Sequence, residues 1–259
     1  MPQSFERLFE IKKESLRLLE EQGFDIEHER VLFEYSLDDF KKYYNDILPT
    51  QDENDIVSFL KKEEINNTRA YMSNIYVSNR TDDLKVIVYF GLSSEKKVSE
   101  ADISYFCRMI QHFDVTNAIL ITEVPLSSAA ESLCIEFVPC RVKKNGKQYG
   151  CFIQHFEDNE LFFNPSDHAY VPIHRLLSEE EIEELIKVEK IRPAQLPQMS
   201  ALDPIAKRLG ARPGDLTRPS DVVEITRKIL VSGTLINEEI FYRGIYMPQK
   251  DKKDRVVRK

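Results

Sequence analysis

The sequence predicts two domains, an α/β domain in the first half and a small α+β domain in the second. Two runs of strand-forming residues, Leu84–Phe90 and Asn117–Thr122, with an amphipathic helical segment between them, predict the α/β domain. A change of composition at Cys140–Gly150, which is basic and poor in apolar residues, indicates a boundary. We therefore expect a first domain at residues 1–145, a second at 146–248 and a basic tail at 249–259.

The first domain is expected to begin with an amphipathic helix that runs from a Ser4 cap to Gly23. Apolar residues share one face of this helix: Phe5, Leu8, Phe9, Leu16 and Leu19. Residues 49–68 are acidic and irregular, and we interpret them as a surface insertion that contains a short helix.

A parallel βαβ core should follow. Leu84–Phe90 is a continuous run of β-branched and aromatic residues, which is typical of a strand buried on both faces. The next helix has Ser99 as its cap and Asp102 as the acid of a capping box. Asn117–Thr122 is the second buried strand, and a right-handed crossover would make the two strands parallel. A further helix starts in "LSSAAESL".

The segment Cys140–Gly150 is either a linker or a hairpin turned at Asn145-Gly146. After it, "CFIQHF" and "ELFFN" are expected to be short strands that open the second domain. "LLSEEEIEELIKVEK" is a helix whose start is well marked, because Ser178 and Glu181 form a capping box.

Prolines and glycines interrupt the stretch Ala194–Asp215. Pro197 favours extended chain, Asp203 caps a short helix whose first residue is Pro204, and Gly210 ends it. A turn and the strand "DVVEITRKILV" follow. Rigid loops of this kind lose little entropy on docking, so the stretch suits a protein contact; a merely well-capped fold element is the alternative.

Composition excludes several classes of protein. A net charge of −8 argues against a nucleic-acid binder that acts through bulk charge, and no apolar run is long enough to span a membrane. The charged, amphipathic N-terminus is unlike a signal peptide, so we expect an intracellular, soluble protein.

The four cysteines form no CxxC pair, and free thiols are favoured over a zinc site at Cys151 and His155. Without a GxGxxG, Walker, HExxH or GxSxG motif, we expect no cofactor and no catalytic residue.

Several spaced motifs in the second half carry a family resemblance. The pattern H-x-x-V-P-x-H-x-x-L-S-x-E matches the sequence at His168, Val171, Pro172, His174, Leu177, Ser178 and Glu180. It continues through Gln195-Leu196-Pro197, Asp203-Pro204, Ala206, Gly210 and Gly214, and ends at Tyr242-Arg243. The chain thereby resembles the fifth subunit shared by the nuclear RNA polymerases, whose C-terminal half matches a small subunit of the archaeal RNA polymerase. The first half resembles the eukaryotic extension of that family, or its form in a eukaryotic virus, more weakly.

The chain also departs from the family. Arg218-Pro219-Ser220 lies before the "VV-x-I" strand, inside an insertion at 215–221, rather than after it. Extra residues separate Gly233 from Tyr242, and the charged tail extends past the usual end. No arginine role is carried over from the family's R-P-S motif, and the insertions are typical of a specialised or a fast-evolving version of the family.

The resemblance implies a non-catalytic, structural subunit of a multisubunit DNA-directed RNA polymerase that acts in transcription. It would reside in the nucleus, or in the nucleolus with polymerase I; a viral copy would reside in the virion or cytoplasm. Its first domain would be part of the jaw near downstream double-stranded DNA, which it would contact weakly and without sequence preference. Its second domain would dock on the largest subunit and assemble with other subunits. No membrane, metal or small-molecule substrate is implied.

The candidate residues follow from this implication. For DNA they lie in the loop after the second strand: Pro125, Ser127 and Ser128. The alternative is that Ser127 or Ser128 merely caps the helix. For the partner they are His174, Gln195, Leu196, Pro197, Asp203, Pro204, Arg208, Gly210, Tyr242 and Arg243. Arg208 is expected to be free to pair with an acid of the partner.

Two other functions remain as alternatives. A magnesium-dependent nuclease would use Asp82, Asp83 and Lys85, although these precede a buried strand instead of following one. An adaptor unrelated to polymerase would have similar interaction surfaces but different companions.

Overall fold

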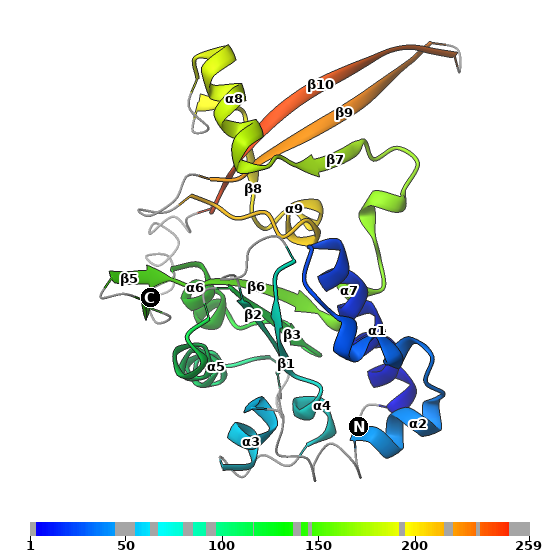
Figure 1. Cartoon of the computed structure of the whole chain (residues 1–259), viewed down its shortest axis with the longest axis vertical. Coiled ribbons are helices and arrows are strands. Elements are labelled where there is room, and N and C mark those ends of the chain that lie inside the picture. The colour runs from blue at the N-terminus through cyan, green and yellow to red at the C-terminus, as the bar shows by residue number, and fades with distance from the viewer. Residues whose placement is uncertain are drawn as a thin grey trace, which may run out of the picture. The chain divides into compact units, whose positions relative to one another are not determined.

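The computed structural model describes residues 4–44, 55–62, 67–79, 85–91, 97–115, 117–136, 141–144, 147–191, 195–214, 220–231 and 234–248. The chain forms two compact units, Met1–Phe163 and Asn164–Lys259, each of which combines helices with a sheet (Figure 1). The prediction of a two-domain protein that mixes helices and sheets is confirmed. The Asn145-Gly146 turn, residues 215–219 of the predicted insertion and the basic tail lie outside the described residues.

Unit 1 contains a four-stranded sheet in the order β1-β2-β3-β6. Its strands are β1 (Asn74–Val77), β2 (Lys85–Phe90), β3 (Asn117–Thr122) and β6 (Phe152–Glu157). β2, β3 and β6 run parallel, and β1 pairs antiparallel with β2. All six residues of β3 are buried, because it is a central strand with layers on both faces.

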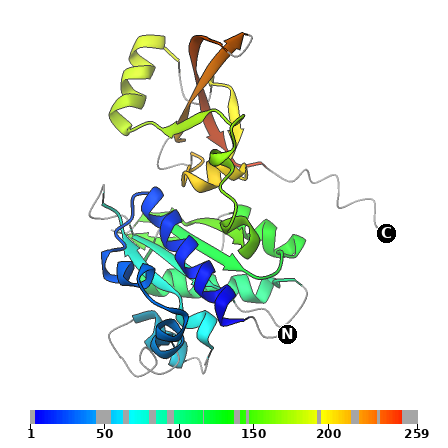
Figure 2. The ribbon, with the colours of Figure 1, turned by 90° about the vertical axis from the view of Figure 1, so that its right-hand side faces the viewer.

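Unit 1 also contains the helices α1 (Phe5–Glu21), η1 (Glu27–Phe33), α2 (Leu37–Lys42), α3 (Asp55–Lys62), α4 (Thr68–Tyr71), α5 (Glu100–Phe113), α6 (Ser128–Glu136) and α7 (Asp158–Leu161). α1 lies across one face, and α5 and α6 lie on the other (Figures 1 and 2). In the part of the chain that the structure describes, no helix is long and apolar enough to cross a membrane.

The predicted helix starts are confirmed in unit 1. The Ser4 hydroxyl accepts a hydrogen bond from the backbone N–H of Arg7, and Gly23 takes a positive φ of 84° after α1. Ser99 and Asp102 form the expected capping box at the start of α5. These ends are local features, which explains why the sequence identifies them.

The division between the units lies later in the chain than the predicted boundary between residues 145 and 146. "CFIQHF" does form a strand, β6, but it pairs with β3 and so completes the sheet of unit 1. "ELFFN" is not a strand: its first two residues belong to α7, which begins with a capping box between Glu157 and Glu160.

The predicted short helix within residues 49–68 is α3, but it is not a surface element. Ile56, Val57 and Leu60 are fully buried in the main core of unit 1. One apolar face of an acidic segment therefore contributes to the core, a role that the segment's average polarity concealed.

Cys140–Gly150 contains a hairpin rather than a linker. β4 (Arg141–Lys144) and β5 (Lys147–Gly150) pair antiparallel and form a separate two-stranded sheet. The predicted turn residues fall between the two strands.

Unit 2 contains a second four-stranded sheet in the order β7-β9-β10-β8. The unit's elements are η4 (Pro165–Asp167), β7 (Ile173–Leu176), α8 (Glu179–Glu189), β8 (Gln198–Ser200), α9 (Pro204–Arg208), β9 (Val222–Val231) and β10 (Thr234–Tyr246). β8 pairs parallel with the end of β10, and the other pairs are antiparallel. The capping box of Ser178 and Glu181 starts α8, as predicted.

Candidate docking surface

The short helix α9 is fixed at both ends by the residues that the sequence singles out. The Asp203 carboxylate accepts a hydrogen bond from the backbone N–H of Ile205 at 2.9 Å, and Pro204 fills the first helical position. Gly210 follows the helix with a φ of 70°, a left-handed conformation that favours glycine. The cap and the stop therefore hold this five-residue helix in a defined geometry.

The Gln195-Leu196-Pro197 motif has two exposed residues around a buried one. Leu196 is 9% exposed and packs in a small core with α8 and β9. Gln195 and Pro197 are exposed, and the Pro197 carbonyl accepts a hydrogen bond from the Gly244 N–H at 3.1 Å. Leu196 thus anchors the segment, while its two neighbours lie at the surface.

His174, Tyr242 and Arg243 are all partly buried within the sheet. Nδ1 of His174 lies 2.7 Å from the Pro172 carbonyl oxygen. Tyr242 packs against the small core, and burial raises its pKa. Neighbouring residues of a strand face opposite sides, so Tyr242 and Arg243 cannot serve the same face of a partner.

The loop after β3 holds the three DNA candidates. The Ser127 hydroxyl accepts a hydrogen bond from the backbone N–H of Ala130 at 3.2 Å, so Ser127 caps α6. Its own N–H donates to the Val98 carbonyl at 3.0 Å. Pro125 and Ser128 are exposed on either side. Two of the three candidates are therefore accessible, whereas the Ser127 hydroxyl already has a structural role.

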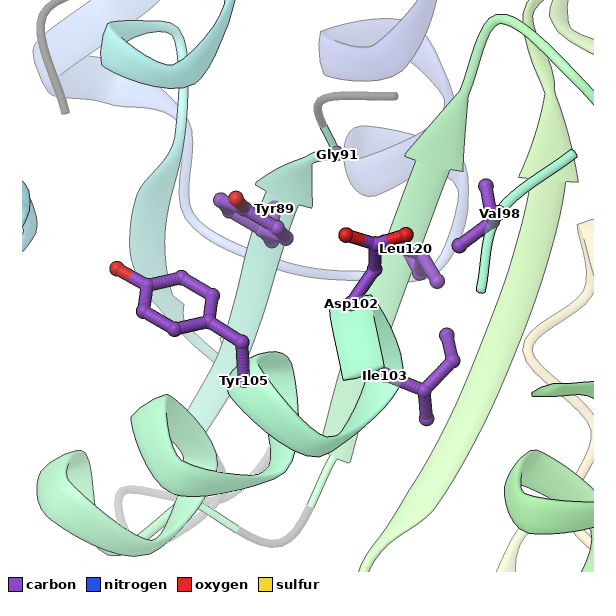
Figure 3. A pocket seen from close by; sticks show the side chains of 7 residues that line it. All are labelled: Tyr89, Gly91, Val98, Asp102, Ile103, Tyr105 and Leu120. Carbon is purple, nitrogen blue, oxygen red and sulfur yellow. The ribbon is translucent and has the colours of Figure 1, made fainter. Parts of the chain in front are cut away.

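A pocket lies in unit 1 where β2 ends and α5 begins (Figure 3). It is lined by Tyr89, Gly91, Val98, Asp102, Ile103, Tyr105 and Leu120. The Asp102 carboxylate accepts hydrogen bonds from the backbone N–H and the hydroxyl of Ser99, each at 2.8 Å. Burial raises the pKa of Tyr89 well above its ordinary value, which keeps its hydroxyl protonated. The lining thus offers an acid already used as a cap and a tyrosine that does not ionise, not a nucleophile with its base.

The described residues contain no group of three or more His, Cys, Asp or Glu that could hold a metal ion. Nε2 of His155 lies 2.7 Å from the Thr122 hydroxyl oxygen. Of the proposed nuclease trio, Lys85 begins β2, and Asp82 and Asp83 lie outside the described residues.

Comparisons with known proteins identify the family. Residues 163–245 match the family model described as RNA polymerase Rpb5, C-terminal domain. The DNA-directed RNA polymerase subunit Rpo5 of Archaeoglobus fulgidus is 49% identical over 81 residues, which cover 31% of this chain and 93% of that protein. The chain belongs to the Rpb5 family of RNA polymerase subunits.

Two further relatives extend the match of this Rpb5-family chain. The subunit Rpo5 of Thermococcus kodakarensis is 54% identical over 71 residues, covering 27% of this chain and 79% of that protein. The Caenorhabditis briggsae protein named DNA-directed RNA polymerases I, II, and III subunit RPABC1 is 24% identical over 230 residues, covering 87% and 96%. The resemblance predicted from the sequence is therefore confirmed, with the strongest identity in unit 2.

One predicted property of the Rpb5-family chain is wrong. Arg208 is not free to pair with a partner's acid, because it is only 8% exposed. Arg208 is the last residue of α9 and has interactions within the chain. The prediction rested on helix position alone, which does not report burial.

Sequence reasoning missed two exposed apolar residues beside the predicted ones. Leu202 is 45% exposed in the turn between β8 and α9, and Tyr246 is 43% exposed at the end of β10. The Ala201 N–H donates to the Tyr246 carbonyl at 2.8 Å, which brings the two segments together. We call the set Gln195, Pro197, Leu202, Pro204 and Tyr246 the β8–α9 strip. The exposure of Leu202 depends on tertiary contacts, so no local signal in the sequence identifies it.

Sequence reasoning also missed an exposed cluster of ion pairs that involves the edge strand β7. Arg175 on β7 donates to both Glu181 oxygens, at 2.7 and 2.9 Å, and to Glu224 on β9 at 3.1 and 3.3 Å. The Ser178 N–H and then Arg175 hold the pKa of Glu181 below its ordinary value. The cluster links β7, α8 and β9, and it depends on a strand register that the sequence does not reveal.

Proposed function

We propose that this chain is a non-catalytic, structural subunit of a multisubunit DNA-directed RNA polymerase. Unit 2 docks on the largest subunit, and unit 1 contributes to the jaw near downstream DNA. The observation that carries the proposal is the match of unit 2 to nearly the whole length of an archaeal polymerase subunit. Its place of action is the nucleus.

The β8–α9 strip supports the docking role. Its residues sit on segments fixed by the Asp203 cap, by the parallel pairing of β8 with β10, and by the buried Leu196. Segments that are already ordered lose little conformational entropy on binding, so more of the contact energy remains as affinity. Apolar Leu202 and Tyr246 with proline neighbours provide the kind of rigid, partly apolar patch that protein interfaces use.

The loop between β3 and α6 supports a weak DNA contact. Pro125 and Ser128 are exposed next to the first turn of α6, where backbone amides and the helix dipole favour anions. Hydroxyl and backbone groups bind phosphates without reading bases, so the contact would be independent of sequence.

Affinity purification of the tagged full-length chain from its native cell, with mass spectrometry of its companions, tests the proposal. We expect the two largest polymerase subunits among the recovered proteins. Recovery of a different assembly without polymerase would indicate an adaptor. Magnesium-dependent cleavage of plasmid DNA that is abolished by EDTA would indicate a nuclease.

A further inference from the structure

The pocket between the end of β2 and the start of α5 has aliphatic walls and a single acid. Three of its walls are buried aliphatic side chains, which are 3%, 0% and 2% exposed: Val98, Ile103 and Leu120. Among the described residues that line the pocket, Asp102 is the one with a charged side chain. A carboxylate in apolar surroundings loses part of the solvation that water would give it, so the pocket favours a ligand of positive charge.

The Asp102 carboxylate is fixed, and one of its oxygens is available to a ligand. Its Oδ2 accepts hydrogen bonds from the backbone N–H and the hydroxyl of Ser99, each at 2.8 Å. Its Oδ1 accepts none from the residues that the structure describes, and Figure 3 shows the carboxylate in the middle of the lining side chains. Because the capping box already orders this side chain, it loses little conformational entropy when it binds a donor.

Tyr89 forms an aromatic wall next to this acid. Its ring stacks on Phe106 with centroids 5.3 Å apart, and it lies 6.3 Å from the ring of Tyr105. Burial raises the pKa of Tyr89, and the nearby Tyr105 and Asp102 raise it further, so its hydroxyl stays protonated. Tyrosine rings attract cations that lie within about 6 Å of the ring centre, so this wall adds to the preference for positive charge.

The size of the pocket fits one side chain rather than a whole small molecule. Its volume is about 160 Å³. Sites for cofactors and similar ligands measure about 300–1,000 Å³, whereas a cavity of about 150 Å³ is filled by a group the size of benzene. Basic side chains combine an apolar methylene chain with a charged end, which matches aliphatic walls beside a carboxylate.

The bonding of Asp102 favours lysine over arginine. The planar guanidinium of arginine pairs best with both oxygens of a carboxylate, and Ser99 already occupies Oδ2. A lysine ammonium is a compact charge on a flexible chain, so it needs only Oδ1. We propose that this pocket receives a lysine side chain of a partner protein, with the ammonium at Asp102 and the methylene chain against Ile103 and Leu120.

This contact is separate from both roles proposed above. Glu100 and Asp102 give the first turn of α5 a negative charge, which repels a phosphate backbone. Val98 is fixed by hydrogen bonds with Pro125 and Ser127, each 3.0 Å long, so the wall is part of the fold. Unit 1 thereby has a protein-binding site of its own, which depends neither on the DNA contact nor on the docking of unit 2.

The first test measures binding of n-butylammonium chloride, which stands for the end of a lysine side chain, to the full-length chain. NMR of the ¹⁵N-labelled protein would follow the backbone amides of residues 98–105 and 120. One charge-assisted contact gives a dissociation constant in the millimolar range, and n-butanol, of the same size but uncharged, should bind about tenfold more weakly.

Asp102→Asn isolates the charge, because an amide oxygen can still accept the Ser99 N–H. We expect its dissociation constant for n-butylammonium to rise about tenfold. The matched control is Glu100→Gln, which removes the same charge from an exposed position in the same turn and should leave binding nearly unchanged. Asp102→Glu retains the charge and should retain most of the binding, which separates loss of charge from damage to the cap.

The second test identifies the occupant in the assembly that the tagged chain recovers. A carbodiimide joins a carboxylate to a lysine amine in contact with it, and mass spectrometry locates the new amide bond. A crosslink from Asp102 to a lysine of another polypeptide is the expected result. A crosslink to a lysine of this chain, or none at Asp102 when other acids of unit 1 react, would overturn the assignment of a partner.

The probe experiment has its own contrary outcomes. Equal affinities of the wild type and Asp102→Asn, equal affinities for n-butylammonium and n-butanol, or shifts of the same amides by inorganic phosphate would show that the pocket is not a lysine site. Since this experiment uses the isolated chain, its result stands whether or not polymerase subunits are recovered.

Discussion

Arg69 and Asp158 form a buried, bidentate ion pair at the carboxyl ends of the parallel strands of unit 1. The two guanidinium nitrogens Nη2 and Nη1 lie 2.7 and 3.0 Å from the two carboxylate oxygens. Arg69 also donates to the backbone carbonyls of Gly91 and Ile121, at 3.1 and 3.3 Å. One side chain therefore joins the ends of β2 and β3 to the residue that follows β6.

Removing the carboxylate of this pair should strongly destabilise unit 1. Asp158→Ala leaves the Arg69 charge buried without its partner, and breaking a buried pair in this way costs about 3–5 kcal/mol. Urea denaturation followed by circular dichroism measures the change. The matched control is Glu183→Ala, which breaks the exposed pair with Lys187 on α8 and should cost about 0.5 kcal/mol or less. Similar losses in the two variants would contradict the assigned role of Arg69.

A second buried network should make stability depend on pH. Nζ of Lys12 lies 2.8 Å from Oε2 of Glu29, and it donates to the Met72 carbonyl at 2.8 Å and to the Tyr76 hydroxyl at 2.9 Å. Burial alone would raise the pKa of Glu29. The Lys12 charge and the hydrogen bonds from Lys12, Tyr76 and Asn74 outweigh burial and hold this pKa below its ordinary value of 4.5.

The direction of the pH effect follows from this lowered pKa. A carboxyl whose pKa is lower in the folded state stabilises the fold above its ordinary pKa, and this contribution is lost as pH falls through the folded value. Glu29→Gln should destabilise the protein by about 3–5 kcal/mol at neutral pH, because Lys12 is left buried without a counter-ion. The difference from wild type should shrink as the pH is lowered from about 5 to 3 in urea titrations. Parallel pH curves for the two proteins would refute this assignment.

The cap of α9 should contribute measurably to unit 2. Asp203→Ala removes the acceptor of the Ile205 N–H and should cost about 1 kcal/mol, whereas Asp203→Asn retains an acceptor and should cost less. Thermal denaturation gives the stability, and pull-down of polymerase subunits gives the docking. If the Ala variant both melts and docks like the wild type, the cap does not organise the β8–α9 strip.

A charge in the β8–α9 strip should disrupt docking without unfolding the chain. Leu202→Arg puts a charge on a residue that is 45% exposed, and we expect about a tenfold or greater loss of recovered polymerase, equivalent to about 1.4 kcal/mol. Val188→Arg on α8, at a residue that is 67% exposed, is the matched control and should dock normally. Equal recovery of both variants would place the interface elsewhere on unit 2.

Substitutions of Ser127 and Ser128, which follow β3, should differ in their effect on stability, because Ser127 caps α6 and Ser128 is exposed. Ser127→Ala removes the α6 cap and should cost about 0.5–2 kcal/mol, whereas Ser128→Ala should leave stability nearly unchanged. Differential scanning calorimetry of the two variants decides between them, and a larger loss for Ser128 would reverse the assignment.

Local features of the sequence were sufficient to predict much of the fold. The caps at Ser4, Ser99, Ser178 and Asp203 were predicted correctly because each requires residues only a few positions apart. The buried strands β2 and β3 were identifiable because continuous apolar runs reflect burial on both faces. In the candidate site, the motif order identified the family, and the caps around α9 indicated a rigid surface.

Long-range pairing explains what the sequence did not reveal. The domain boundary was misplaced because β6 pairs with β3 across α6 and the β4–β5 hairpin, and no local pattern specifies that partner. Arg208 was expected to be free because its burial depends on neighbours that its helix position does not indicate.

By itself, the sequence determined where α1, α5, α8 and α9 begin, that β2 and β3 are buried, and to which family the chain belongs, because these features show in neighbouring residues, continuous apolar runs and ordered motifs. Only the tertiary structure decided that Arg69 meets Asp158, and that Leu202 and Tyr246 are exposed on two segments that a backbone hydrogen bond joins. Strand register and burial arise from contacts between residues distant in the chain, and the free energies of those contacts are not encoded in any single segment.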